Sequence, residues 1–148
     1  MEPGLQVKDD PVLYRGTLSP DERRLPLRKV GASGYLTELC SLEGRPPIRI
    51  APPGAVDFYL AWSPDGKQAF LSVPSSVSSD RGRTYAIPLP HGKMLPPIPV
   101  GGFRTEAQIA ALPGARIDSF DVAPGPTPGT YAFARETLLR NLYRIPVQ

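Results

Sequence analysis

The sequence feature that most constrains the fold is a proline-centred turn, Ser-Pro-Asp-Gly at 63–66, set between the apolar segments 57–62 and 68–73. The proline presets the φ that the second turn position needs, and the aspartate can accept a hydrogen bond from its own backbone. The glycine accepts a positive φ at little cost. The stretch therefore predicts a strand, a tight turn and a second strand.

The same arrangement recurs twice in weaker form. Ser-Pro-Asp-Glu at 19–22 separates the apolar segments 12–18 and 25–27, and Ala-Pro-Gly-Pro at 123–126 separates predicted strands at 117–122 and 130–134. The turn prolines Pro20, Pro64 and Pro124 are 64 − 20 = 44 and 124 − 64 = 60 residues apart. A period of about 40 to 45 residues with four strands per unit is typical of a propeller blade.

Each turn is followed by further strand patterns. A predicted strand at 35–42 precedes Pro-Pro-Ile-Arg-Ile at 46–50, and a predicted strand at 84–89 precedes a turn at 91–92 and Pro-Pro-Ile-Pro-Val at 96–100. The likeness of the two Pro-Pro-Ile segments predicts that each forms the last strand of its unit.

One short helix is expected before the third unit. Thr105 and Gln108 have the spacing of a capping box, and Phe103 can pack onto Ile109 as a hydrophobic staple. The pattern predicts a helix over residues 106–112, which Pro-Gly at 113–114 ends. The helix accounts for much of the longer second interval.

Composition supports an all-β fold. Twenty prolines and fourteen glycines exclude long helices, while 41% apolar residues oppose disorder. The net charge of +3 is scattered among short clusters such as Arg28-Lys29, which favours a solvated surface over a nucleic-acid interface. Cys40 is the single cysteine, so no disulfide can form within the chain.

No segment has the pattern of a signal peptide or a membrane span, so the sequence as written predicts a cytoplasmic location. That prediction lapses if the chain is part of a longer protein.

Three segments carry a family resemblance: Ala-Trp-Ser-Pro-Asp-Gly-Lys at 61–67, Phe-Leu-Ser-Val at 70–73 and Tyr-Ala-Ile-Pro-Leu at 85–89. They resemble the TolB-like, WD-repeat-like bacterial β-propeller repeat. The ending at 140–147 is similar to the last strands of such repeats in propellers attached to serine/threonine kinases and winged-helix regulators. The resemblance implies antiparallel four-stranded blades around a channel, with the strand before each turn lining the axis. It implies no particular activity.

These patterns predict an all-β chain of antiparallel propeller-type blades, about three repeats in a partial ring, with one inserted helix. The predicted units are an N-terminal arm at 1–11, with a candidate edge strand at 5–7, and a propeller-like domain at 12–148. Within that domain we expect blade 1 at 12–52, blade 2 at 56–101, the helical insertion at 104–113, and blade 3 at 115–148 without its fourth strand.

Three blades are too few to close a ring, which takes about four to eight. The chain would then be a fragment of a larger propeller, a homodimer that completes a ring, or an open arc. The interpretation favoured here is a fragment, such as a C-terminal half.

The search for catalytic or cofactor chemistry predicts none. Gly-Ala-Ser-Gly-Tyr at 31–35 lacks the final glycine of a hydrolase elbow, and His91, the single histidine, sits in a predicted exposed turn. The acidic residues lack the spacing of a calcium loop, and no phosphate-binding loop or dinucleotide fingerprint is present. The sequence predicts no catalytic residue, no cofactor and no metal.

Candidate ligand contacts are polar residues on or beside the axis-lining strands: Asp57, Tyr59, Asp118 and Asp121. They could meet a polar ligand or peptide at a channel mouth, although polar residues that merely hydrate the channel are the favoured interpretation. Core packing between blades is favoured for Trp62.

The function predicted from these features is a non-catalytic interaction module for a protein or peptide partner. The alternative is a sensory or accessory propeller segment of a larger enzyme, such as a serine/threonine kinase or a prolyl-oligopeptidase-like peptidase. A regulator with a nucleic-acid partner is a third class, disfavoured by the scattered charge.

Overall fold

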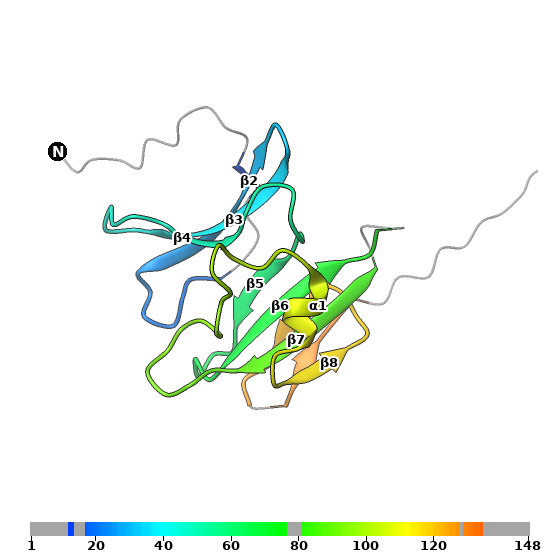
Figure 1. Cartoon of the computed structure of the whole chain (residues 1–148). Coiled ribbons are helices and arrows are strands. Elements are labelled where there is room, and N and C mark those ends of the chain that lie inside the picture. The colour runs from blue at the N-terminus through cyan, green and yellow to red at the C-terminus, as the bar shows by residue number, and fades with distance from the viewer. Residues whose placement is uncertain (1–11, 14–16, 77–80, 128, 135–148) are drawn as a thin grey trace, which may run out of the picture.

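The computed structural model describes residues 12–13, 17–76, 81–127 and 129–134. They form antiparallel β-sheets with one short helix, so the prediction of an all-β fold is confirmed (Figure 1). In this part of the chain no sheet closes into a ring.

The first sheet follows the chain in simple order. Every strand pairs antiparallel with the next, in the order β1-β2-β3-β4. Its strands are β1 (Val12–Leu13), β2 (Arg24–Gly31), β3 (Gly34–Ser41) and β4 (Ile48–Ala51).

The second sheet repeats this order as β5-β6-β7-β8, again with antiparallel pairing throughout. A long connection that contains helix α1 (Glu106–Ala110) separates its last two strands. A hairpin of β9 (Ala123–Pro124) and β10 (Tyr131–Ala132) follows. The strands of the second sheet are β5 (Tyr59–Trp62), β6 (Gln68–Pro74), β7 (Gly82–Pro88) and β8 (Ala115–Ile117).

The two Ser-Pro-Asp turns have the same hydrogen bonds. The N–H of Ser19 donates to the carbonyl of Arg24 at 2.9 Å, and that of Ser63 donates to the carbonyl of Gln68 at 3.0 Å. In each turn the serine hydroxyl donates to the aspartate two residues later, which lowers the pKa of that carboxyl. The fourth position has φ of 57° at Glu22, against 68° at the glycine of the second turn. Glutamate therefore adopts the conformation that the second turn assigns to glycine.

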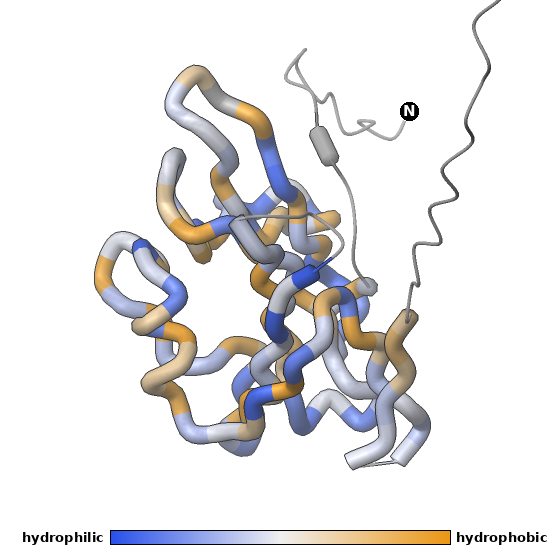
Figure 2. Tube along the Cα trace, turned by 90° about the vertical axis from the view of Figure 1, so that its right-hand side faces the viewer, coloured by the Kyte–Doolittle hydropathy of each residue, from blue (hydrophilic) through white to orange (hydrophobic). Residues whose placement is uncertain are grey.

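The second sheet is buried on both faces, and residues 69–73 of its strand β6 are all buried. One face, with Leu71 and Ile87, packs against the first sheet, while the opposite face, with Phe70 and Ala86, packs against Val122. The first sheet and the hairpin accordingly lie on opposite sides of the second sheet (Figure 1). Figure 2 shows apolar and polar residues interspersed along the trace. The central sheet therefore has a neighbour on each face.

The turns of the two sheets touch each other. A Cβ added to Gly66 would lie 2.9 Å from the Cβ of Pro20, so the second turn has no room for a side chain at this position. The equivalent bends of the two sheets thus lie side by side.

Helix α1 is shorter than the predicted 106–112 but begins where expected. The side-chain oxygen of Gln108 accepts hydrogen bonds from the N–H groups of Arg104 at 2.7 Å and Thr105 at 3.3 Å. The two residues of the predicted staple, Phe103 and Ile109, are both fully buried in the core between the sheets. The helix start predicted from the sequence is confirmed.

The strand predicted at 96–100 is wrong. Pro97 and Pro99 have no N–H to donate to a strand ladder, and residues 96–100 form no strand. The chain instead runs on to Phe103, whose N–H donates to the carbonyl of Ile50 at 2.8 Å. The fourth strand of the second sheet is β8, beyond the helix, so the helix lies within the second sheet's connection and not between two units.

Two further strand predictions near the C-terminal end need correction. Residues 118–121 are bends, so of the strand predicted at 117–122 only Ile117, the last residue of β8, is in a strand. The predicted turn at 123–126 starts with the two residues of β9, and the N–H of Gly125 donates to the carbonyl of Thr130 at 2.8 Å just before β10. The predicted strand at 130–134 is confirmed for its residues 131–132.

Several predictions fall outside the described residues. They are the N-terminal arm at 1–11 with its candidate strand at 5–7, and the C-terminal segment 135–148 with its propeller-like ending.

Candidate functional site

The most unusual side chain of the fold is Arg28, which β2 points toward the second sheet. Its guanidinium forms an ion pair with Asp57 and donates a hydrogen bond to the hydroxyl of Tyr59 at 2.6 Å. The guanidinium carbon lies 3.8 Å from the ring centroid of Tyr35 and 4.9 Å from that of Tyr59. Cation–π contacts of this kind hold a guanidinium in place.

A third part of the chain completes this group. The rings of Tyr59 and Phe120 have centroids 5.4 Å apart, so the bends after β8 return to the start of β5. We refer to Arg28, Tyr35, Asp57, Tyr59 and Phe120 together as the Arg28 cluster. It joins the first sheet, the second sheet and the segment that leads to the hairpin.

The Arg28 cluster buries charge without satisfying every polar atom. The side chains of Arg28 and Asp57 are 11% and 22% exposed. Oδ1 of Asp57 and Nε of Arg28 are buried and have no hydrogen-bond partner among the residues that the structure describes. Burial raises the pKa of Asp57, while the positive charge of Arg28 acts in the opposite direction. One acceptor and one donor in this cluster are therefore buried with their hydrogen-bonding capacity unused.

The structure brings together only two of the four predicted contacts, Asp57 and Tyr59. Asp118 lies at the end of the outermost strand β8, exposed, where Nη2 of Arg116 is 2.8 Å from Oδ1. Asp121 is exposed and has a φ of 56°. The described contacts therefore link Asp57 and Tyr59 through Arg28, while the carboxylate of Asp118 is paired with Arg116.

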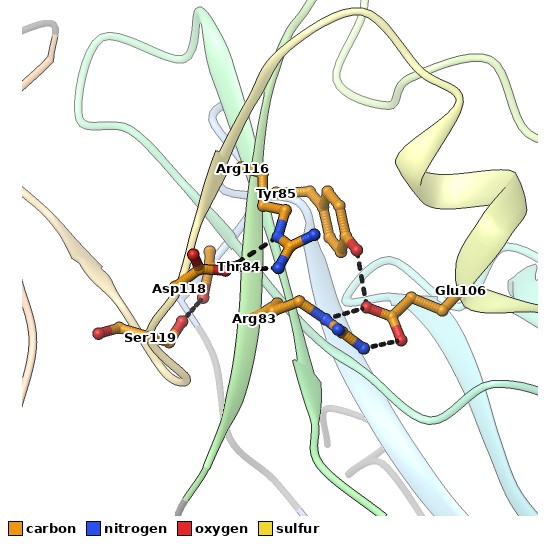
Figure 3. A network of polar contacts seen from close by, with 7 residues as sticks. All are labelled: Arg83, Thr84, Tyr85, Glu106, Arg116, Asp118 and Ser119. Atoms are coloured by element: carbon orange, nitrogen blue, oxygen red, sulfur yellow. Dashed lines mark hydrogen bonds and ion pairs between the residues drawn. The ribbon is translucent and has the colours of Figure 1, made fainter.

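A buried hydroxyl pair fixes the bends that carry Phe120. The hydroxyls of Ser72 and Thr84 are 2.8 Å apart. Thr84 donates to the carbonyl of Ser119 at 2.8 Å (Figure 3). Thr84 has a single hydroxyl hydrogen, so Ser72 donates to Thr84. This relay ties the segment 118–121 to the central strands.

A second polar network anchors α1 to β7 (Figure 3). Glu106 accepts two hydrogen bonds from the guanidinium of Arg83, both at 2.7 Å, and one from the hydroxyl of Tyr85 at 2.7 Å. Burial alone would raise the pKa of Glu106, but these donors outweigh it and the pKa is lowered. Burial and the bond to Glu106 raise the pKa of Tyr85. With every oxygen engaged, this network is suited to holding the helix.

The remaining candidates have structural roles. Trp62 is buried in the core between the sheets, as predicted, and its indole N–H donates to the carbonyl of Met94 at 2.7 Å. His91 is exposed in the turn at 91–92, which is formed as expected. Burial raises the pKa of the Cys40 thiol, which disfavours a reactive thiolate.

Sequence reasoning missed Arg28, which it assigned to a solvated basic cluster. The signal was present in the alternation of β2. Arg28 and Ser72 occupy equivalent positions in the two repeated sheets, because they are 72 − 28 = 44 residues apart, like the two turn prolines. Ser72 points into the buried face that carries Phe70. The repeat therefore predicts an inward direction for Arg28, whereas composition alone predicts an outward one.

Within the described ranges, no group of three or more His, Cys, Asp or Glu residues could hold a metal ion. The single helix among these residues is too short to cross a membrane. Comparison with protein-family models, with curated proteins and with solved structures found no match to this chain.

Proposed function

We propose that this chain is a non-catalytic interaction module of the β-propeller type that binds a protein or peptide partner at the Arg28 cluster. Three features support propeller-type stacking: two four-stranded sheets in the same strand order, turns repeated at 44 residues, and a central sheet covered on both faces. In such an arrangement the Arg28 cluster lies beside the first strand of the second sheet, between neighbouring repeat units.

The observation that carries the binding proposal is the unpartnered carboxylate oxygen of Asp57, which is buried in this structure, so a ligand must displace neighbouring side chains to reach it. A buried acceptor without a hydrogen bond costs about 1–3 kcal/mol, which a donor from a ligand would recover. Tyr35 is 39% exposed and extends the cluster to the surface. A peptide that supplies an N–H or a cationic side chain next to an apolar one fits these groups.

The proposal is tested by panning a displayed peptide library on the full chain and measuring the affinity of enriched peptides by calorimetry. We expect peptides with a basic residue that lose at least about tenfold in affinity, about 1.4 kcal/mol, on the Asp57→Asn variant. Tyr59→Phe removes only a hydroxyl and should weaken binding less.

Asp118→Asn is the matched control, because it neutralises an exposed carboxylate that pairs with Arg116 and does not belong to the Arg28 cluster. It should leave peptide affinity unchanged. The proposal fails if no peptide is enriched, or if enriched peptides bind the Asp57→Asn and Asp118→Asn variants equally while circular dichroism shows both to be folded.

A further inference from the structure

The side chains of the Arg28 cluster differ in how firmly the backbone holds them. Arg28 and Tyr35 lie on β2 and β3, which pair with each other, and Tyr59 lies on β5, which pairs with β6. Phe120 lies instead on the segment 118–121, whose four residues are bends. A segment outside the strand ladders opens at a lower free-energy cost than a paired strand. The ring of Phe120 can therefore move with the least disturbance of the two sheets.

We call residues 118–121 the lid. It begins after Ile117, the last residue of β8, and ends before Val122, which is 4% exposed in the core. Between these two points the hydroxyl of Thr84 donates to the carbonyl of Ser119 at 2.8 Å (Figure 3). Thr84 is fully buried on β7, so this bond attaches the lid to an inner strand of the second sheet.

The lid also contains a strained backbone conformation. Asp121 has a φ of 56°, in the left-handed region that residues other than glycine rarely adopt. Such a conformation persists where surrounding contacts hold it in place. The packing of Phe120 on Tyr59 and the bond from Thr84 are contacts of this kind. Loss of the Thr84 hydroxyl should therefore release the lid.

We propose that the lid closes the Arg28 cluster and that Thr84 is the positioning residue that keeps it closed. The inference rests on the proposed function, because Oδ1 of Asp57 is buried and a ligand reaches it after a neighbouring side chain has moved. Movement of Phe120 away from Tyr59 provides that opening without breaking a strand pair. The apparent affinity for a ligand is reduced to the extent that few chains are open, so a chain with a looser lid should bind the ligand more tightly.

Carbodiimide labelling of carboxylates, measured by mass spectrometry, tests the lid without any ligand. The reagent modifies accessible carboxylates, so the exposed Asp65 serves as the internal reference. Thr84→Val keeps the shape of the side chain but removes its hydroxyl, and we expect it to raise the labelling rate of Asp57 at least about threefold. Thr84→Ser keeps the hydroxyl and should show the wild-type rate.

Tyr85→Phe is the matched control, because it removes a hydroxyl from the next residue of β7. It breaks the bond to Glu106 but leaves the lid attached, so the labelling rate of Asp57 should not change. If Thr84→Val unfolds, Phe120→Ala replaces it and should also raise the rate. A folded Thr84→Val chain with the wild-type rate overturns the proposal. A Thr84→Ser or Tyr85→Phe chain that is labelled as fast as Thr84→Val overturns it as well.

Peptide binding distinguishes this inference from the proposed function. Enriched peptides should bind the Thr84→Val chain about threefold more tightly than the wild-type chain, whereas mere damage to the site would weaken binding. Faster labelling of Asp57 in a Thr84→Val chain that binds no peptide would overturn the interaction site alone. Peptide binding by chains in which Thr84→Val changes neither the affinity nor the labelling of Asp57 would overturn the lid alone.

Discussion

The first and second sheets have the same strand order and the same turn, yet they bury different surfaces. The second sheet is covered on both faces, and Leu71 and Phe70 on its two sides are 1% and 3% exposed. The first sheet is covered on the face that holds Arg28, while its opposite face combines leucines with the ion cluster in which Glu38 pairs with Lys29 and Arg49. Two sheets with the same strand order therefore carry different types of residue on their faces.

The difference shows that position in the stack, and not the turn, decides what a strand residue must be. The Ser-Pro-Asp turn needs only its own hydrogen bonds, so both copies keep it. A residue that faces a neighbouring sheet must be apolar or fully paired. A residue at the end of the stack may be charged, as Lys29 is, where its counterpart Val73 is 5% exposed in the core.

The largest expected effect contrasts the same substitution on the two sheets. Leu71→Ala should lower the free energy of unfolding by about 3 kcal/mol, because it leaves a cavity in the core. Leu36→Ala should cost about 1 kcal/mol, since its side chain is only half-buried. Urea unfolding of each variant beside the wild-type chain measures both. Equal losses would contradict the difference between the two faces.

The two turns should respond in opposite directions at their fourth position. Gly66→Ala should cost about 2 kcal/mol, because it strains a positive φ and brings a methyl group against Pro20. Glu22→Gly should raise stability by about 0.5 kcal/mol, since it relieves a positive φ but frees the unfolded chain. Thermal and urea unfolding check both. A stability gain in the first variant would be incompatible with the contact between the turns.

A smaller effect concerns Glu106, whose network exists only on the second sheet. The pKa of Glu106 is lowered in the folded chain. Its contribution to the free energy of unfolding is therefore fully present above the unfolded pKa of about 4.3, and it is lost as the pH falls through the folded pKa. Because Arg83 is 43% exposed, screening should limit the loss in Glu106→Gln to about 1 kcal/mol at pH 7.

Unfolding measured between about pH 7 and pH 2 tests the sign. The Glu106→Gln variant should show a shallower fall in stability at acid pH than the wild-type chain. Asp118→Asn, which alters an exposed ion pair, should shift stability by less than about 0.5 kcal/mol. If the stability of the Glu106→Gln variant fell as steeply at acid pH as that of the wild-type chain, the role of this carboxyl would be refuted.

Local chemistry allowed the turns, the all-β class and the helix start to be predicted. Ser63, Pro64 and Asp65 specify their bend through bonds within six residues, and Gln108 caps a neighbouring turn. The fourth strand was mispredicted because residues 96–100 look like residues 46–50 in composition. Pairing with β7 depends instead on backbone N–H groups that Pro97 and Pro99 lack, and on residues 115–117 that lie beyond the helix.

The candidate site was only half visible in the sequence for a related reason. Asp57 and Tyr59 precede a recognisable turn, so their place on the first strand of the unit could be predicted. Arg28 and Phe120 join them through contacts between sheets, over 29 residues or more of sequence. No local pattern encodes such a contact, although the 44-residue correspondence indicates which way Arg28 points.

The central claim is that equivalent turns of two repeated sheets lie against each other. Nuclear Overhauser spectroscopy on the labelled chain measures this directly. The account predicts cross-peaks between the ring protons of Pro20 and the α-protons of Gly66. Their absence, in a chain whose strand cross-peaks within each sheet are present, would contradict the stacking of the two units.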